Sequence, residues 1–374
     1  MFDTIVLETE GFYIYDLDRF SPNARLVRDS KARFAKCQNN PSAADKKKGI
    51  YKPRLTLLNR ARALILKIEF SAPKLLYGNN LDELDESQFD EVVTVLQQQL
   101  KEMGVRVWRK EIEKAKVTAF HPSKNVPLSE GYTASYIIKE LAKLDVPKYL
   151  DINKADFRNN GHALQFYSAT NAFVVYDKIA DLNKPASRAI DKAPTLTQLD
   201  LFRQIRQRQL PIEVLRLEIR LVGTKKINAV LVEHGYQPKP TFKDIFSQQL
   251  CKSIVQNYWQ RHVQERDLCN LNLLDSSQQQ LINLTRRFPG MRPKRAIYLI
   301  GLAAALSDEE GIRGLRQITD KGFSKTSWQS LKEDAKQYLK DDSLPDTRGY
   351  DLVAKTLKVF HPYRLPAELQ CKEK

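Results

Sequence analysis

The chain has 374 residues, of which 42% are hydrophobic and 28% are charged. This length predicts two or three domains with a substantial buried core, and the composition is ordinary for a soluble globular protein. Lys and Arg total 61 and Asp and Glu total 45, which gives a net charge of +16 and a sequence pI of about 9.5. Proteins this basic commonly bind a polyanion, and nucleic acid is the most common one.

Several classes of protein are disfavoured by what the sequence lacks. The longest apolar run, Ala296–Leu306, is shorter than the about 20 residues that span a bilayer, and the N-terminus shows no signal-peptide pattern. The four cysteines lack C-x-x-C spacing, so we expect a cytoplasmic protein without a disulfide framework, a cysteine zinc site or membrane contact. The motifs of P-loop hydrolases, Rossmann-fold enzymes, zinc proteases and serine esterases are absent.

The first half of the chain mixes predicted strands and helices. Residues 1–60 combine short apolar stretches with polar loops and contain a basic run at Lys46–Lys48. Apolar, β-rich stretches predict strands, and apolar residues at helical spacing predict helices. In chain order we expect a strand over 63–70, a loop over 71–80, a helix over 87–103 that ends at Gly104, a strand over 116–121 and a polar turn over 122–125.

The next elements include the most regular strand pattern in the sequence, over 214–222. Its leucine and isoleucine residues occupy one face, whereas Arg216, Glu218 and Arg220 occupy the other. The remaining predicted elements of this region are a helix over 134–144, hairpin strands over 162–168 and 172–177, and helices over 195–208, 225–234 and 242–263.

This order of elements predicts an α+β fold, with helices on one face of a mainly antiparallel sheet and the other face available for a ligand. A polar stretch over 276–280 predicts a linker between a first domain of residues 1–275 and a smaller helical domain of residues 281–374. In that second domain, a helix around Ile312 and another around Trp328 flank a glycine turn at 320–322. The arrangement is similar to a DNA-binding helix-turn-helix, and simple helix packing is the alternative.

Tyr176 and Lys178 are candidates for chemistry. Positions two apart on a strand face the same way, so these side chains share a face if the strand continues to Lys178. A tyrosine hydroxyl, with a pKa near about 10, is a weak nucleophile, and a neighbouring cation, base or metal favours its phenolate. On a basic protein such a tyrosine is suited to attack on a DNA phosphate; a purely structural pair is the alternative.

A second group of candidates surrounds Glu218. Glu218 and His121 are predicted at strand positions that face the open side of the sheet, where they could hold Mg²⁺ or Mn²⁺ together with water and phosphate. Arg216 and Arg220 flank Glu218 as salt-bridge partners or phosphate clamps. Beyond His121 lies a polar turn whose side chains can donate hydrogen bonds to phosphate: Ser123, Lys124 and Asn125.

Five stretches in order resemble the phage and plasmid replication proteins of the filamentous-phage gene II/X family. They are F-S-A-P-K-L-L-Y-G-N-N (70–80), H-P-S-K-N (121–125), R-N-N-G-H (158–162), V-V-Y-D-K-I-A-D-L (174–182) and V-L-R-L-E-I-R-L (214–221). The resemblance covers about residues 50–260 and continues more faintly into the helical part. Lys74, Asn79 and Asn80 in the first stretch are predicted DNA contacts.

The resemblance implies a rolling-circle replication initiator. Such an enzyme nicks one strand of supercoiled origin DNA through a tyrosine, remains bound to the 5′ phosphate and later rejoins the displaced strand. It implies Tyr176 as the nucleophile and Glu218 as the acidic position. Its partners would be origin DNA, as duplex and single strand, together with the helicase and polymerase of a bacterial host.

One departure concerns the metal site. Many rolling-circle initiators carry a His–hydrophobe–His motif, where this sequence has Gln165, Phe166 and Tyr167. Gln165 is therefore a candidate oxygen ligand, and Tyr167 a competing nucleophile. Two other functions remain open from the sequence: a mobilisation relaxase with similar chemistry, and a DNA-binding regulator without catalysis.

Overall fold

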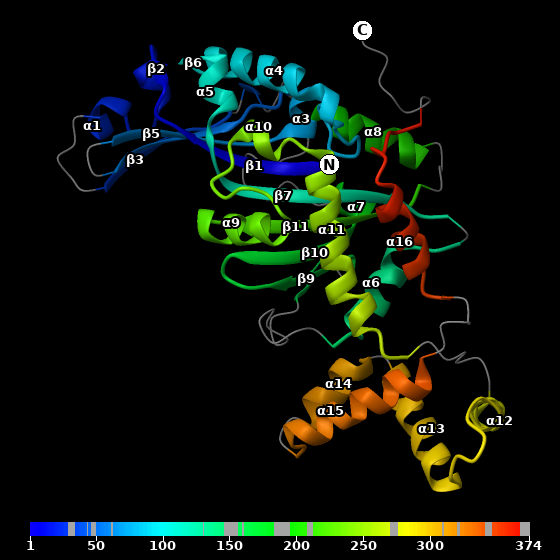
Figure 1. The fold of residues 1–374 in the computed structure, drawn as a ribbon. Coiled ribbons are helices and arrows are strands. Elements are labelled where there is room, and N and C mark those ends of the chain that lie inside the picture. The colour runs from blue at the N-terminus through cyan, green and yellow to red at the C-terminus, as the bar shows by residue number, and fades with distance from the viewer. Residues whose placement is uncertain are drawn as a thin grey trace.

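The computed structural model describes residues 1–28, 34–42, 44–45, 50–60, 63–129, 131–145, 156–158, 161–182, 195–207, 212–269, 276–308, 310–319, 322–340 and 346–366. It confirms the predicted α+β class, with a large antiparallel sheet and a helical C-terminal region (Figure 1). The basic run Lys46–Lys48 and most of the predicted turn at 320–322 lie outside the described residues.

Within the described residues, nine strands form one sheet in the order β3–β4–β5–β1–β7–β11–β10–β9–β8, and the neighbours pair antiparallel. The bounds are β1 Phe2–Thr9, β3 Phe34–Asn39, β4 Arg54–Arg60, β5 Ala63–Ser71, β7 Lys116–Pro127, β8 Asp156–Arg158, β9 Ala163–Tyr167, β10 Asn171–Asp177 and β11 Val214–Val222. Two short strands, β2 (Phe12–Ile14) and β6 (Val105–Val107), form a separate ribbon.

The first sixty residues contribute three strands of this sheet that the sequence pattern did not reveal. β1 lies near the middle of the sheet, and Ile5, Val6 and Leu7 are all buried. A strand that is covered on both faces shows no alternation of apolar and polar residues, so its period-2 signal is lost. Residues 34–60 form β3 and β4 at one edge, preceded by the short helix α1 (Ala24–Arg28).

Two predicted loops are regular structure. The predicted loop over 71–80 contains helix α3 (Ala72–Tyr77), which Gly78 ends with a φ of 65°. The predicted polar turn over 122–125 is part of β7, which continues to Pro127. Ser123 pairs with Glu218 and Asn125 with Arg216 of β11, so polar residues occupy a central strand because the neighbouring strand supplies polar partners.

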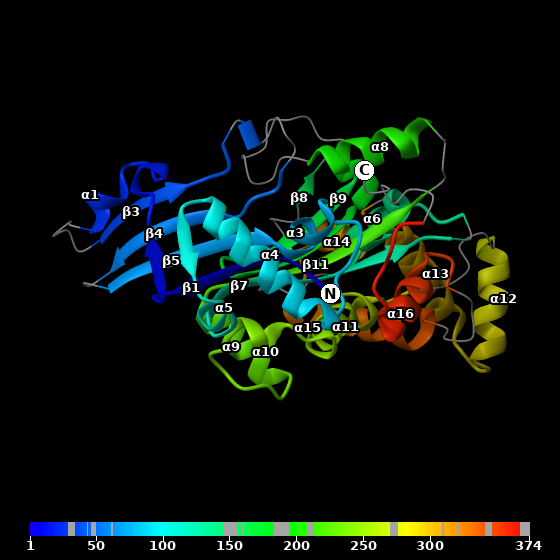
Figure 2. The same ribbon diagram turned by 90° about the horizontal axis from the view of Figure 1, so that it is seen from above.

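The apolar face of the sheet carries the main core. Leu215, Leu217, Ile219 and Leu221 of β11 are buried there, as predicted. Helices α9, α10, α11 and α16 cover this face on the side opposite α8 (Figure 2). The bounds of these four helices are α9 Thr224–Glu233, α10 Phe242–Ile245, α11 Gln248–His262 and α16 Tyr350–Val359. Three further helices of the first part of the chain are α4 Phe89–Glu102, α5 Arg109–Glu113 and α6 Ala134–Ala142.

The opposite face of the sheet is polar in its centre and covered at one end. Helix α7 (Lys178–Leu182) follows β10, and α8 (Leu196–Gln207) packs through Leu201 and Ile205. Their small apolar cluster includes Val214, which shares a face of β11 with Arg216 and Glu218. The polar residues of β11 therefore lie beside a covered end of this face.

The C-terminal helices form a second core, but the end of the chain returns to the first. Helices α12 (Ser277–Arg287), α13 (Pro293–Ser307), α14 (Gly311–Thr319) and α15 (Lys325–Asp334) pack around a separate cluster that includes Leu299 and Ile312. The predicted linker over 276–280 is instead the start of α12, capped by Ser276. Tyr350, Val353 and Leu357 of α16 belong to the main core, so the predicted second domain does not extend to the C-terminus.

No helix of the described residues is both long enough and apolar enough to cross a membrane.

We expect Leu217→Ala to lower the free energy of unfolding by about 2–5 kcal/mol, because truncating a buried leucine removes apolar contacts and leaves a cavity. Leu217 has no exposed surface and lies on the central strand of the core. Val222→Ala at the exposed end of the same strand is the matched control, with 46% exposure in the parent residue. Urea unfolding measures the free energy of unfolding of both variants. An equal loss in the two would contradict the assignment of Leu217 to the buried core face.

Candidate functional site

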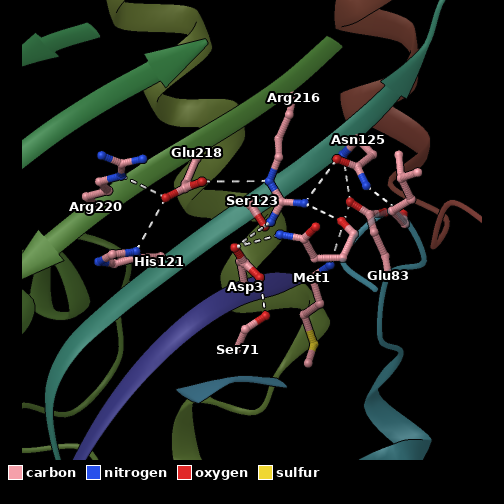
Figure 3. A network of polar contacts seen from close by, with 12 residues as sticks. Met1, Asp3, Ser71, Glu83, His121, Ser123, Asn125, Arg216, Glu218 and Arg220 are labelled. Carbon is pink, nitrogen blue, oxygen red and sulfur yellow. Dashed lines mark hydrogen bonds and ion pairs between the residues drawn. The ribbon is translucent and has the colours of Figure 1, made fainter. Parts of the chain in front are cut away.

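Glu218 is the centre of a cluster of charged side chains on the polar face of the sheet. Its Oε1 accepts a hydrogen bond of 2.8 Å from Nε of Arg220 and lies 3.4 Å from Nδ1 of His121 (Figure 3). Its Oε2 lies 3.7 Å from Nε of Arg216 and accepts a hydrogen bond of 3.1 Å from the hydroxyl of Tyr176. Burial opposes the charge of Glu218, but Arg220, His121 and Arg216 outweigh it and hold its pKa well below the usual range.

The sheet register explains how residues far apart in sequence meet here. Tyr176 of β10 is opposite Arg216 of β11, and Glu218 is opposite Ser123 of β7. Residues directly opposite one another in an antiparallel pair share a face, so three adjacent strands present these side chains to the same side. The structure therefore brings together the predicted nucleophile, the acidic position, both arginines and His121.

Tyr176 is a neutral phenol in this arrangement. Only 7% of the residue is exposed, and its hydroxyl donates to Glu218. Burial raises the pKa of Tyr176 well above its usual value, although the Arg216 guanidinium favours the phenolate. To act as a nucleophile, Tyr176 must therefore lose its proton as a phosphate approaches, since the phenolate is not stable beforehand.

Lys178 lies beside this tyrosine by a different route from the predicted one. The strand ends at Asp177 and α7 begins at Lys178, so the two side chains do not share a strand face. Nevertheless, Nζ of Lys178 lies 5.5 Å from the centre of the Tyr176 ring. Lys178 is 1% exposed, and burial together with the Arg216 charge lowers its pKa to about 7.

Arg216 is held rigidly by the surrounding chain. Its guanidinium is almost fully buried and donates to the Asn80 carbonyl oxygen (2.9 Å), Asn125 Oδ1 (3.2 Å) and Ser123 Oγ (3.0 Å), and it lies 3.5 Å from Asp3 Oδ2. A buried guanidinium with this many partners is fixed in place. Arg216 therefore acts on Tyr176 and Glu218 but cannot reach out to a ligand, which corrects its prediction as a DNA contact.

Lys124 and Asn125 are also structural, which corrects the prediction that they contact phosphate. Lys124 is opposite Leu217 and so points to the other side of the sheet from Ser123. Its ammonium is buried, paired with Glu83, and donates to the His361 carbonyl oxygen (2.7 Å). Asn125 is fully buried and donates its side-chain amide to the Leu81 carbonyl oxygen (2.7 Å). Ser123 is 1% exposed and is a partner of Arg216.

The predicted contacts from the stretch over 70–80 are buried as well. Asn79 caps the following turn, accepting from the backbone N–H groups of Leu81 and Asp82 at 2.9 Å. Asn80 accepts from the side chain of Gln198 at 2.8 Å. Lys74 is 8% exposed, with its ammonium 6.0 Å from the centre of the Tyr51 ring. This stretch forms the support behind Arg216, and we assign it no direct contact with DNA.

Arg220, His121 and the β9 residues form the accessible side of the cluster. The side chain of Arg220 is 37% exposed and that of His121 is 15% exposed. Gln165 and Tyr167 of β9 are half-buried, and Gln165 is aligned with Glu218 across Val174. A phosphate that approaches Tyr176 would meet this side first.

The residues present fit a divalent cation only if water and phosphate complete its shell. The described residues contain no group of three or more His, Cys, Asp or Glu side chains that could hold a metal. However, Nδ1 of His121 is buried without a hydrogen-bond partner in the described part of the chain, and it faces the Glu218 carboxylate. The ring nitrogen of a neutral imidazole and an adjacent carboxylate oxygen are two ligand atoms suited to Mn²⁺ or Mg²⁺.

Asp3, Ser71 and Glu83 are important to the site but were not predicted from the sequence. Asp3 accepts from Ser71 (2.5 Å) and pairs with Arg216, and Glu83 accepts from the backbone of Asn125 (2.6 Å). All three lie far from β11 in the sequence, and no motif spacing marks them. The strand order, in which β5 pairs with β1 and β1 pairs with β7, brings Ser71 and Asp3 to the site. Glu83, which lies on no strand, reaches it through its contact with the backbone of Asn125.

No family model, curated protein or solved structure matches the chain.

We expect Glu83→Gln to destabilise the fold by about 3–5 kcal/mol near neutral pH, because it leaves the buried Lys124 ammonium without its partner. Burial opposes ionisation of Glu83, but the Met1 amino group and Lys124 lower its pKa below 4.5. The contribution of ionised Glu83 to the free energy of unfolding is therefore fully present above pH 4.5, and it is lost as the pH falls through the lowered pKa.

The difference in free energy of unfolding between wild type and Glu83→Gln should therefore shrink in acid. Urea unfolding at about pH 6 and about pH 3 measures it. Glu10→Gln, at an exposed position, is the control. A difference that stays constant between the two pH values would count against a buried, ionised Glu83.

Proposed function

We propose that this protein is a DNA nicking and joining enzyme with Tyr176 as its nucleophile. The observation that carries the proposal is the hydrogen bond from the Tyr176 hydroxyl to Glu218, which is itself bound by Arg220. A phenol held by a carboxylate and flanked by guanidinium groups supplies a nucleophile, a carboxylate that orients its hydroxyl and cations that neutralise phosphate charge. The net charge of +16 supports a DNA substrate.

In the proposed step, the phenolic oxygen of Tyr176 attacks a backbone phosphorus. A bond between phosphorus and the tyrosine oxygen forms, and the bond from phosphorus to the 3′ oxygen breaks. The phenolic proton passes to water, because Arg220 and His121 keep the Glu218 carboxylate ionised and its pKa low, and the departing 3′ oxygen takes a proton from water to become a 3′ hydroxyl. Because one phosphodiester replaces another, attack by a 3′ hydroxyl in reverse rejoins the strand without nucleotide hydrolysis.

The arginines have different parts in this step. Arg216 is buried beside Tyr176 and favours the phenolate electrostatically. Arg220 is partly exposed and is placed to bind the incoming phosphate, since a guanidinium can donate two parallel hydrogen bonds to phosphate oxygens. His121 and Glu218, with Gln165 at the rim, are the residues that would hold Mg²⁺ or Mn²⁺, which supplies polarisation of the phosphate when bound.

The cellular role that best fits this chemistry is the start of rolling-circle replication of a phage or plasmid. The resemblance of the five ordered motifs supports that role over transfer by a mobilisation relaxase. The substrate would be supercoiled origin DNA, and a host helicase and polymerase would act on the nicked product. The chain would then work in the cytoplasm of a bacterial host.

We expect Tyr176→Phe to bind DNA but to form no nick and no covalent adduct, because the variant keeps the ring and removes the attacking oxygen. The measurement is incubation with supercoiled DNA of the protein's own replicon and Mg²⁺ or Mn²⁺, followed by denaturing gels with and without protease. Wild type should give a nicked circle with protein attached to the 5′ end. Tyr167→Phe, on the neighbouring strand, is the matched control and should still nick.

Two outcomes would contradict this assignment. An adduct that persists in Tyr176→Phe and disappears in Tyr167→Phe would move the nucleophile to Tyr167. Origin binding without any nick by wild type would favour a second function, a DNA-binding regulator without catalysis. The burial of Tyr176 to 7% exposure is the observation that favours this second function, because a buried phenol bonded to a carboxylate also stabilises a fold.

The pH dependence of nicking tests the part played by Lys178. Its ammonium lies over the face of the Tyr176 ring, where a positive charge stabilises the developing negative charge of the step. Because its pKa is lowered to about 7, this charge is present below pH 7 and lost above it. We expect the nicking rate to fall as the pH rises through about 7 and this fall to be absent in Lys178→Met. A rate that rises through the same range would instead make Lys178 a general base.

A further inference from the structure

A cluster of cations on the C-terminal helices has no part in the site described above. We call it the basic corner, and it comprises Arg286, Arg287, Arg292, Lys294 and Arg295. The sequence contains no Asp or Glu from Ser276 to Ser307, so nothing within these helices balances the five charges. The basic corner therefore carries a large part of the +16 net charge within a short stretch of chain.

The fold brings these cations together at one place. Arg286 and Arg287 end α12, and Lys294 and Arg295 lie in the first turn of α13, so a short turn separates the two pairs (Figure 1). Gly290 has a φ of 85° within this turn, a conformation that favours glycine. Phe288 fixes the turn to the helical core, with its ring 4.9 Å from that of Tyr338.

Most of the corner remains open to solvent and without a neutralising partner. Arg286, Arg292 and Lys294 are exposed, and their side chains form no hydrogen bond or ion pair within the described part of the chain. Arg295 pairs with Asp334, which is the one carboxylate ion-paired to the corner among the described residues. Like charges held this close repel one another, so their assembly costs stability unless an anion binds.

The neighbouring helices α14 and α15 point their cations elsewhere. Arg316 donates to Asp145 of the main domain at 2.6 Å, and Lys332 lies 3.6 Å from the same carboxylate. The helices around the predicted helix-turn-helix thus use these charges to hold the two parts of the chain together. The exposed side chains of Arg286, Arg292 and Lys294 take no part in that contact.

We propose that the basic corner binds the phosphate backbone of duplex DNA, as a second contact apart from the Tyr176 cluster. Four of its five cations are arginines, whose planar guanidinium groups match phosphate oxygens. The choice of DNA as the polyanion rests on the proposed function, whereas binding to a phosphate backbone rests on the corner itself. Contacts of this kind hold the protein on DNA without reading its sequence.

The test is a double variant of the full chain, Arg292→Ala with Lys294→Ala. Anisotropy of a labelled duplex of arbitrary sequence gives the affinity over a range of salt concentrations. Each phosphate contact contributes about 0.9 to the slope of log affinity against log salt, so loss of two contacts should lower the slope by about 1.8. The matched control is Lys355→Ala with Lys358→Ala, which removes the same charge from exposed positions of α16 and should change the slope less.

An unchanged slope in Arg292→Ala/Lys294→Ala, or the same fall in both double variants, would overturn the proposal. In a second arm, binding of Arg292→Ala/Lys294→Ala to vesicles of phosphatidylserine and phosphatidylcholine is compared with that of wild type. If this variant loses vesicle binding but keeps wild-type duplex binding, the proposal is overturned. Arg292 and Lys294 are exposed and are not part of the helical core, so we expect the double variant to fold. Circular dichroism checks this. Tyr176→Phe should keep the wild-type slope, so failure of nicking and failure of the basic corner give different results.

Discussion

The buried guanidinium of Arg216 is the constraint on which the polar half of the sheet depends. A charge placed between central strands is stable only when many polar groups surround it. Asp3, Asn80, Ser123 and Asn125 provide them, and they come from three separate stretches of chain. Because Arg216 ties these stretches together, it also fixes the position of everything on its face of β11.

The same charge sets the properties of the proposed nucleophile. Arg216 lies opposite Tyr176 and near Glu218, so it stabilises both the carboxylate and any phenolate that forms. Burial acts in the other direction and keeps the resting phenol neutral. Balance between these two effects is typical of groups that change charge during a reaction, because the site then favours the charged form only when a substrate completes it.

The site and the basic corner show two uses of positive charge in one chain. At the Tyr176 cluster, Arg216 is buried and both Arg216 and Arg220 are paired with Glu218, so each guanidinium is held in a defined position. At the corner, the side chains of Arg286, Arg292 and Lys294 are exposed and lack partners within the described residues, which suits the proposed contact with a phosphate backbone. The proposed nicking of a long DNA would use both: the cluster for the chemistry and the corner to keep the substrate bound.

The sequence by itself determined the elements with strong local patterns and the polar residues that they carry. The alternation over β11 predicted its two faces, because each residue of a strand reports its own side of the sheet. The sequence could not determine which distant polar residues meet Arg216, nor that Lys124 points away from Ser123, because those facts depend on strand order and register. The tertiary structure decided them: polar groups buried on a central strand need partners, and long-range pairing alone supplies partners such as Asp3 and Asn80.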